Sequence, residues 1–358
     1  MREEVESILT KYASIELTYE APSFLEYIVT SGSVERYFNE VFRELVKLGY
    51  QPLLAVQSGH EVLRVFRVGV GEIRRTVYYA LALATVAAVV ATGYFNTLSF
   101  YECLGVNTGG ILLSILAFTL SILIPLALHE MGHFVTSKVT GVPTPLPLFI
   151  PAPIVSPLGT FGAVITTRFL PQDRKSLAFL GISGPLVGVV MSLLALVITL
   201  RISPVVKLEE LACADVSPIG FAPLSMYVML ISGFIPQVEG TVILLHPAAL
   251  ASMLLLLIHF ANLLPIGQLD GGHVIRSLTS MELHRVISMV IPAFLVVLSL
   301  FVPAYRWLGF FSILAIFISG FRPHIGYSNQ ASKLPTKDRV LLLVVYLLLL
   351  LVTLPVPL

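Results

Sequence analysis

Residues 111–133 read ILLSILAFTLSILIPLALHEMGH, and this stretch decides how the rest of the chain is interpreted. Its first 18 residues, 111–128, carry no charge, and three ionisable side chains follow at once. About 20 apolar residues are needed for a helix to cross a bilayer, so residues 111–139 predict a membrane-spanning helix. Ionisable side chains at membrane depth are costly to bury, which makes the three that follow functional candidates.

The HEMGH segment has the spacing of a metal site. His129 and His133 are four residues apart, so on a helix they share one face and can bind one metal ion together. Glu130 lies beside them and can act as a general base, which is the HExxH arrangement of zinc hydrolases. The alternative is a pair of helix-end histidines at the interface with no metal.

Composition extends the membrane prediction to most of the chain. Of 358 residues, 56% are hydrophobic and only 12% are charged. Residues 1–75 hold 20 of the 43 charged side chains, and charge-free apolar stretches fill much of residues 76–358. We therefore expect a polytopic α-helical membrane protein with a small soluble α+β domain at residues 1–75, not an ordinary cytosolic protein. The net charge of +1, without a basic patch, argues against strong non-specific attraction to nucleic acid, so we expect no nucleic-acid partner.

The N-terminal domain has a mixed pattern. Residues 15–20 alternate apolar and polar side chains, which is typical of a half-buried strand. A helix is predicted near residues 38–46, and two strands at 51–57 and 62–68 flank a turn at 58–60. Nothing in this domain resembles a catalytic site. Regulation, substrate capture, partner docking and a passive structural role all stay open.

Hydropathy predicts about six to seven transmembrane helices. The seven candidate spans lie near residues 77–95, 111–139, 177–200, 246–267, 286–303, 307–321 and 339–355. Basic residues favour the cytoplasmic side of a membrane, and four arginines at positions 64, 67, 74 and 75 precede the first span. Alternating spans then place ten of the thirteen later basic residues on the same side. Since charged residues follow Met1 where a signal peptide would be apolar, we expect a multi-pass protein of the cell membrane with a cytoplasmic N-terminal domain.

The same topology places the two cysteines in outer-side loops. Cys103 follows the first span and Cys213 follows the third. A disulfide between them is one hypothesis, because a shared side is necessary for pairing. Two free cysteines are the other.

A catalytic zinc needs a third protein ligand and an open position for water. Asp270 ends a second uncharged stretch, residues 250–269, within the segment NLLPIGQLDGG at 262–272. One crossing separates the two segments, so both polar clusters reach the cytoplasmic ends of parallel spans. Pro265 and the glycines around Asp270 would break the helix there, which is tolerated where the backbone is buried or lines a cavity. The alternative makes Asp270 the start of a glycine-rich turn.

The paired HEMGH and NLLPIGQLDG segments resemble the site-2 protease family of intramembrane zinc metalloproteases, peptidase family M50. The resemblance covers a catalytic core of about residues 111–285, including GISGP at 181–185 and PLGTFG at 157–162. The chain has Leu263 where a proline often stands, and it lacks a PDZ-like insert. It is therefore more similar to the archaeal and plastid-type subgroup.

The resemblance implies specific roles for five residues. His129, His133 and Asp270 would bind one Zn²⁺ per chain, and Glu130 would be the general base. Asn262 would hold the substrate or the developing oxyanion. The implied activity is an intramembrane endopeptidase that cleaves single-span membrane proteins within or near their transmembrane segments, with a transmembrane metalloprotease domain at residues 76–358.

Cleavage inside a helix requires the substrate to unwind, since its carbonyls are already hydrogen-bonded. Residues 144–170 contain strand-like stretches at Ile154, 162–165 and 166–167. We predict a re-entrant β-hairpin that could pair with an extended substrate by strand addition. The alternative is a hairpin that only closes the site.

Three other classes of function share part of this sequence pattern with the protease. A membrane metal transporter could use intramembrane histidines and aspartate as a transit site, but it does not require the base Glu130. An inactive protease-like scaffold is disfavoured because the ligands and the base are all present. A metalloprotease with a glutamate as third ligand lacks a suitably placed residue after His133. The oligomeric state stays open.

Overall fold

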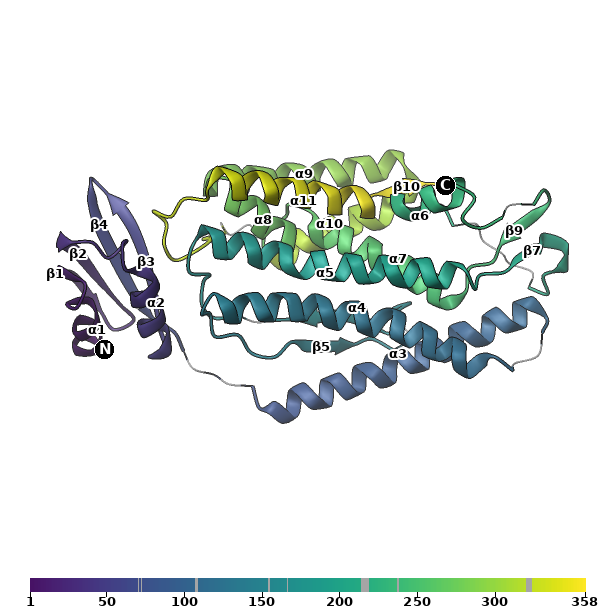
Figure 1. The fold of residues 1–358 in the computed structure, drawn as a ribbon, viewed down its shortest axis with the longest axis horizontal. Helices are drawn as coiled ribbons and strands as arrows, with labels where there is room; N and C mark the ends of the chain where they lie inside the picture. Colours follow the sequence, from purple (N-terminus) through teal and green to yellow (C-terminus); the bar gives the residue numbers. More distant parts are fainter. Residues whose placement is uncertain are drawn as a thin grey trace.

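The computed structural model describes residues 1–69, 71, 73–106, 109–153, 155–165, 167–213, 219–236, 238–319 and 324–358. A small β-sheet domain lies at one end of an elongated bundle of helices (Figure 1). The N-terminus lies in the sheet domain and the C-terminus at the opposite end of the bundle. The predicted combination of an α+β N-terminal part and a helical bundle is observed.

The N-terminal domain is a four-stranded antiparallel sheet with two helices. Its elements are α1 (Arg2–Leu9), β1 (Ala13–Ala21), β2 (Phe24–Gly32), α2 (Phe38–Lys47), β3 (Tyr50–Gln57) and β4 (His60–Arg67). The strands are ordered β1-β2-β4-β3, which leaves β3 at an edge. Ser58 and Gly59 both have positive φ, as a two-residue hairpin turn requires. Residues from both helices and the sheet form one apolar core, in which Phe42, Leu45 and Leu63 are fully buried.

Among the described residues, the helical bundle contains eight helices of nine residues or more. They are α3 (Arg75–Leu104), α4 (Ile111–Val139), α5 (Arg174–Leu200), α7 (Pro247–Leu263), α8 (Asp270–Leu278), α9 (Met281–Phe301), α10 (Arg306–Ser319) and α11 (Thr336–Thr353). Shorter elements are β5 (Leu148–Pro151), β6 (Thr160–Val164), β7 (Val205–Lys207), η1 (Leu208–Glu210), β8 (Phe221–Pro223), α6 (Leu224–Ile231), β9 (Thr241–Ile243), η2 (Pro303–Tyr305) and β10 (Pro355–Pro357).

Each predicted span falls on one of these helices. Within the described residues, four helices are long and apolar enough to cross a membrane: α3, α4, α5 and α9. Helix α7 is shorter than its predicted span of 246–267 because it ends at Leu263, before Pro265. The number of spans therefore stays a prediction, while the coarse picture of a helical membrane protein agrees with the structure.

Strands β5 and β6 form an antiparallel hairpin against α3. Its turn packs tightly, since a Cβ atom on Gly159 would lie 2.8 Å from the carbonyl oxygen of Ala88 and 2.8 Å from Thr92 Oγ1. Both α3 residues are near the middle of that helix. The hairpin thus reaches halfway along a helix long enough to span a membrane. Ile154 and Thr166, which the sequence also marked as strand-like, lie outside the described residues.

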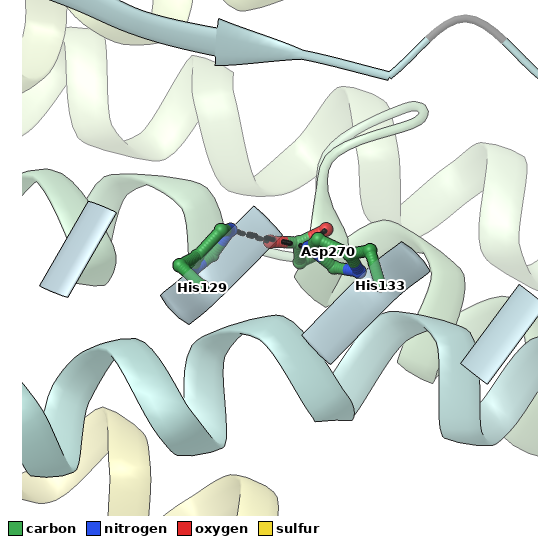
Figure 2. Close-up of side chains that lie close together, drawn as sticks. All are labelled: His129, His133 and Asp270. Atoms are coloured by element: carbon green, nitrogen blue, oxygen red, sulfur yellow. Dashed lines mark hydrogen bonds and ion pairs between the residues drawn. The ribbon is translucent and has the colours of Figure 1, made fainter. Parts of the chain in front are cut away.

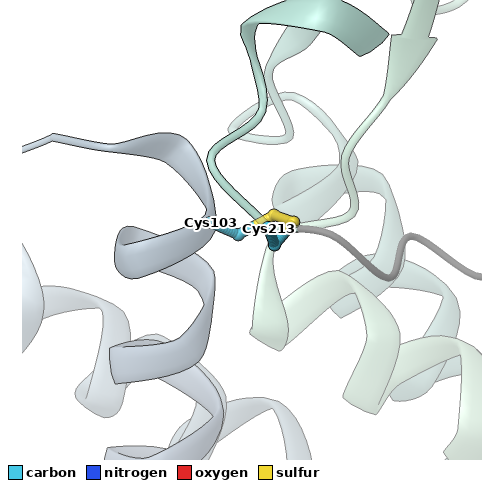
Figure 3. Close-up of a disulfide and its surroundings, with 2 residues drawn as sticks. All are labelled: Cys103 and Cys213. Atoms are coloured by element: carbon cyan, nitrogen blue, oxygen red, sulfur yellow. A yellow bond between two sulfur atoms is a disulfide. The ribbon is translucent and has the colours of Figure 1, made fainter.

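The end of the bundle far from the sheet domain is closed by short strands and a disulfide. Strand β7 pairs with β9, and β8 pairs with β10 near the C-terminus. Cys103 and Cys213 form a disulfide with a Cα–Cα distance of 4.6 Å (Figure 3). Of the two hypotheses for the cysteines, the structure therefore has the bridge, which joins the end of α3 to the loop after α5.

The sheet domain is docked on the bundle through the edge strand β3. The Leu54 N–H donates to the Ser328 carbonyl at 2.9 Å, and the Gln330 N–H donates to the Leu54 carbonyl at 2.9 Å. The same loop also bonds to the segment before α5, because the Ser328 N–H donates to the Pro171 carbonyl at 2.8 Å. Residues 328–330 therefore lie between the sheet domain and the bundle, hydrogen-bonded to both.

The buried side chain of Gln51 completes this contact. Its Nε2 donates to Ser328 Oγ at 2.6 Å, and its Oε1 accepts the Leu170 N–H at 2.7 Å. We expect Gln51→Ala to loosen the docking by about 1–3 kcal/mol, because two buried polar groups lose their partner. Hydrogen exchange should then become faster at the Leu54 and Gln330 amides, while Gln57→Ala, at an exposed position of β3, should leave both rates unchanged. Equal protection in Gln51→Ala and the wild type would contradict this prediction.

Candidate metal centre

Helix α4 presents three ionisable side chains near its end. His129 and His133 lie one turn apart on the same face, and Glu130 follows His129 directly. Their exposed fractions are 4% for His129, 6% for Glu130 and 9% for His133. Such burial is expensive for groups of this kind unless they have partners. The partners come from another part of the chain.

Asp270 reaches the same point from the start of α8. Helix α7 ends at Leu263, and the chain turns through Pro265 and Gly267, whose φ is +51°. Helix α8 then begins at Asp270 itself. A Cβ atom on Gly271 would overlap the carbonyl of Leu263, so only glycine allows this close return. The helix break predicted around Asp270 is present.

The three predicted metal ligands converge (Figure 2). Asp270 Oδ2 lies 3.3 Å from His129 Nε2, and Asp270 Oδ1 lies 3.3 Å from His133 Nε2. The two Nε2 atoms are 3.1 Å apart. Glu130 Oε1 is 3.9 Å from His129 Nε2, so the carboxyl lies beside the cluster. Among the described residues this is the single group of three or more such side chains with metal-binding geometry.

The donor atoms fit a zinc ion. The Nδ1 of His133 bonds to the Leu180 carbonyl at 2.8 Å, which makes Nδ1 the donor and leaves the Nε2 lone pair facing Asp270. Such an outer contact fixes the ligand tautomer in metal sites. The Nδ1 of His129 is buried and has no hydrogen-bond partner in the described part of the chain. Two imidazole nitrogens and one carboxylate are a typical protein ligand set for catalytic zinc.

Helix α7 supplies two neighbours of the cluster. Asn262 Nδ2 donates a hydrogen bond to Asp270 Oδ2. The ring of His259 stacks on that of His129, with centroids 5.1 Å apart and planes at 22°. Asn262 thus contacts the carboxylate of a predicted ligand, in addition to any role toward the substrate. The spacing of His259 and Asn262, three residues apart on a helix, already places them on one face.

Helix α5 presents glycines toward the cluster, and the sequence alone did not explain why they are there. A Cβ on Gly184 would overlap the His133 ring, and one on Gly188 would lie 2.9 Å from His129 Nδ1. A Cβ on Gly181 would lie 2.9 Å from the Asp270 carbonyl oxygen. The small-residue spacing at 181, 184 and 188 was the available signal, since such residues let helices approach closely. The three glycines therefore make room for His129, His133 and Asp270.

A second group of histidines comes from α8, α9 and the segment between α10 and α11. His273 Nδ1 is 2.8 Å from His324 Nε2, and the rings of His284 and His324 are 5.3 Å apart. Burial, aided by neighbouring imidazoles, lowers the pKa of His324 to about 2. The charge of Arg276, whose Nε donates to the His324 carbonyl at 3.0 Å, acts in the same direction. His324 is therefore neutral near pH 7.

Comparison with known proteins agrees with this geometry. A model of peptidase family M50 matches residues 117–302. "Probable zinc metalloprotease EGY2, chloroplastic" from Arabidopsis thaliana is 29% identical over 153 residues, which is 43% of this chain and 27% of that protein. The EGY2 protein of Oryza sativa subsp. indica is 24% identical over 176 residues, 49% of this chain and 31% of its own length. "Probable zinc metalloprotease EGY1, chloroplastic" from Arabidopsis thaliana is 27% identical over 157 residues, 42% of this chain and 27% of that protein.

The matched region contains every residue of the cluster. The family match begins before His129 and ends after Asp270. The chain spans roughly a quarter to a third of the length of these plant relatives, from 27% to 31%. The family match covers more than half of the chain and confirms the resemblance noted in its motifs. The chain belongs to peptidase family M50.

Proposed function

We propose that this protein is an intramembrane zinc endopeptidase that hydrolyses peptide bonds within or near transmembrane segments of other membrane proteins. The observation that carries the proposal is the convergence of His129, His133 and Asp270 beside Glu130, from helices far apart in sequence. Family membership and the names of the plant relatives support the same activity. One Zn²⁺ per chain would be held by the two imidazoles and the carboxylate.

A zinc ion held by His129, His133 and Asp270 would supply Lewis acidity, the chemistry that lowers the pKa of water and polarises a carbonyl. The other roles belong to the protein. Glu130 lies 3.9 Å from His129 Nε2 and can accept a proton from the attacking water and return it to the leaving amine. Asn262 orients Asp270 through its hydrogen bond, and its remaining amide hydrogen can donate to the substrate carbonyl as charge develops.

Substrate binding is assigned to the β5–β6 hairpin. The two strands pair only with each other among the described residues, so each keeps an outer edge. An extended substrate segment could add to such an edge, which would supply backbone hydrogen bonds to a helix that has unwound. Gly159, in the turn of the hairpin, packs near the middle of α3, and this position supports a re-entrant hairpin. The expected substrates are single-span membrane proteins.

The proposed orientation places residues 1–75 in the cytoplasm and the metalloprotease domain, residues 76–358, in the cell membrane. The sheet domain and the disulfide lie at opposite ends of the bundle (Figures 1 and 3). Disulfides persist in oxidising compartments, so the bridge supports an outer location for the far end. The arginines before α3 support a cytoplasmic location for the near end.

Zinc analysis and a cleavage assay on the same preparations test the proposal. We expect the wild type to bind one zinc per chain and to cleave a single-span protein in proteoliposomes. Asp270→Ala should lower zinc affinity by more than about 10–100-fold, since even outer contacts of metal ligands are worth that much. It should also remove cleavage.

A matched aspartate provides the control. Asp338 pairs with Lys175 at 2.8 Å, away from the cluster, so Asp338→Ala should keep both zinc and cleavage. Zinc bound without cleavage of any single-span substrate would favour the scaffold, and zinc flux across liposomes would favour the transporter. Full zinc occupancy in Asp270→Ala would overturn the ligand assignment.

A further inference from the structure

A cavity of about 560 Å³ lies where the sheet domain meets the bundle. Its walls come from residues that follow β4, from the first turn of α3, from the last turns of α4 and from the segments on either side of the β5–β6 hairpin. These elements are distant in sequence, and the metal site does not use this space. The cavity is therefore separate from the metal site.

The cavity gathers positive charge from three separate elements. Arg75 begins α3, Lys138 belongs to the last turn of α4, and Arg168 follows β6. None of the three has a carboxylate within ion-pair distance in the described part of the chain. Lys138 lies over the ring of Phe134, 5.3 Å from its centroid, and Arg168 donates to the Gly69 carbonyl at 2.5 Å. Neither contact supplies a negative charge, so the cavity, as its described residues line it, suits an anion.

The remaining walls suit an amphiphile. Tyr78, Phe134 and Phe169 add aromatic surface beside the bases. Tyr79 also lines the cavity and is 65% exposed, and Leu83, one turn further along α3, is 72% exposed. An apolar strip thus continues from the cavity along the outside of a membrane-length helix, where acyl chains would lie. Aromatic and basic residues are the usual composition of a membrane–water interface.

We propose that this cavity binds the phosphate headgroup of an anionic phospholipid from the cytoplasmic leaflet. The proposal rests on the orientation given under the proposed function, but not on the protease activity. Because the walls include both the sheet domain and the bundle, a bound headgroup ties the two together at the membrane surface. Anionic lipid then stabilises the docked position of the N-terminal domain.

The test uses the full chain in detergent and measures the thermal unfolding midpoint against added ligand. The probes are a short-chain phosphatidylglycerol, a short-chain phosphatidylcholine, glycerol phosphate and inorganic phosphate. We expect tight binding of phosphatidylglycerol alone. Lys138→Gln should weaken it about fivefold and the double variant Lys138→Gln/Arg168→Gln roughly 25-fold, from the usual contribution of a base near an anionic headgroup.

Matched variants separate this site from general charge attraction. Lys333→Gln/Lys337→Gln removes two exposed bases of the same predicted side that do not line the cavity, and it should bind like the wild type. Arg168 also holds the Gly69 carbonyl, so Lys138→Gln alone provides the result if the double variant is unstable without lipid.

Three results would overturn the proposal. They are unchanged binding in Lys138→Gln, equal binding of phosphatidylcholine, and equal binding of glycerol phosphate or inorganic phosphate, which would assign the site to a soluble phosphate. Each can occur whether or not the zinc site is catalytic. A failure here is thus distinguishable from a failure of the proposed protease activity.

Discussion

Glu130→Gln is expected to lower the cleavage rate by roughly 10²–10⁴-fold, the usual contribution of general acid–base catalysis, while zinc binding is kept. The carboxyl of Glu130 lies beside the cluster, 3.9 Å from His129 Nε2, whereas the side chains of His129, His133 and Asp270 contact one another. An amide cannot accept the proton from water, but it preserves the size of the side chain. Cleavage of a single-span substrate in proteoliposomes and zinc content in the same preparation measure the two effects.

The control for this variant is Glu282→Gln. Glu282 is exposed in the first turn of α9 and does not belong to the cluster. Both activity and zinc should match the wild type in that protein. Full activity in Glu130→Gln would rule out Glu130 as the base, and loss of zinc would make it a ligand instead.

Gly184→Ala is expected to remove most of the activity although it adds only one methyl group. A Cβ at this position would lie 2.6 Å from Cδ2 of His133, so the imidazole must move from its place opposite Asp270. Displacing a ligand should lower zinc affinity at least as much as loss of an outer contact, by roughly 10–100-fold. Zinc titration against a competing chelator measures this directly, and cleavage should fall in parallel.

Helix propensity alone would favour alanine at position 184, so the expected loss of activity does not come from the helix itself. Gly184 lies inside α5, where alanine is favoured over glycine by about 1 kcal/mol. Gly220→Ala is the matched control, because no neighbouring atom of the described residues lies within 4 Å of the Cβ that it would add. It should leave zinc affinity and cleavage unchanged. Normal zinc affinity in Gly184→Ala would mean that helices α4 and α5 move apart enough to accept the methyl group without displacing His133.

The sequence predicted some of the N-terminal domain and missed the rest. Helix α2 and strands β1, β3 and β4 were anticipated from apolar spacing and turn residues, and the structure confirms them. Helix α1 and strand β2 were not. The signal for β2 was present, since Leu25, Tyr27 and Val29 alternate and all three are buried. Helix α1 has only eight residues, and helices this short depend on tertiary packing.

The candidate site was anticipated to a similar degree. His129, Glu130 and His133 follow from local spacing on one helix, and Asp270 from its place at the end of an uncharged stretch. The stacking of His259 on His129 and the contact of the Leu180 carbonyl with His133 were not anticipated. Each contact joins residues that lie on different helices and at least 47 positions apart in the chain. A helical period does not encode such neighbours.

The sequence alone determined the membrane class of the chain, the helix that carries HEMGH and the break before Asp270, because hydropathy, helical period and proline or glycine effects act over neighbouring residues. Only the tertiary structure decided that Asp270 meets both histidines, that Gly184 must lack a side chain, that Cys103 reaches Cys213 and that residues 328–330 hold the sheet domain. These features are contacts between segments distant in the chain. The energies of these contacts depend on how distant segments of the chain pack together, and a local sequence pattern does not specify that packing.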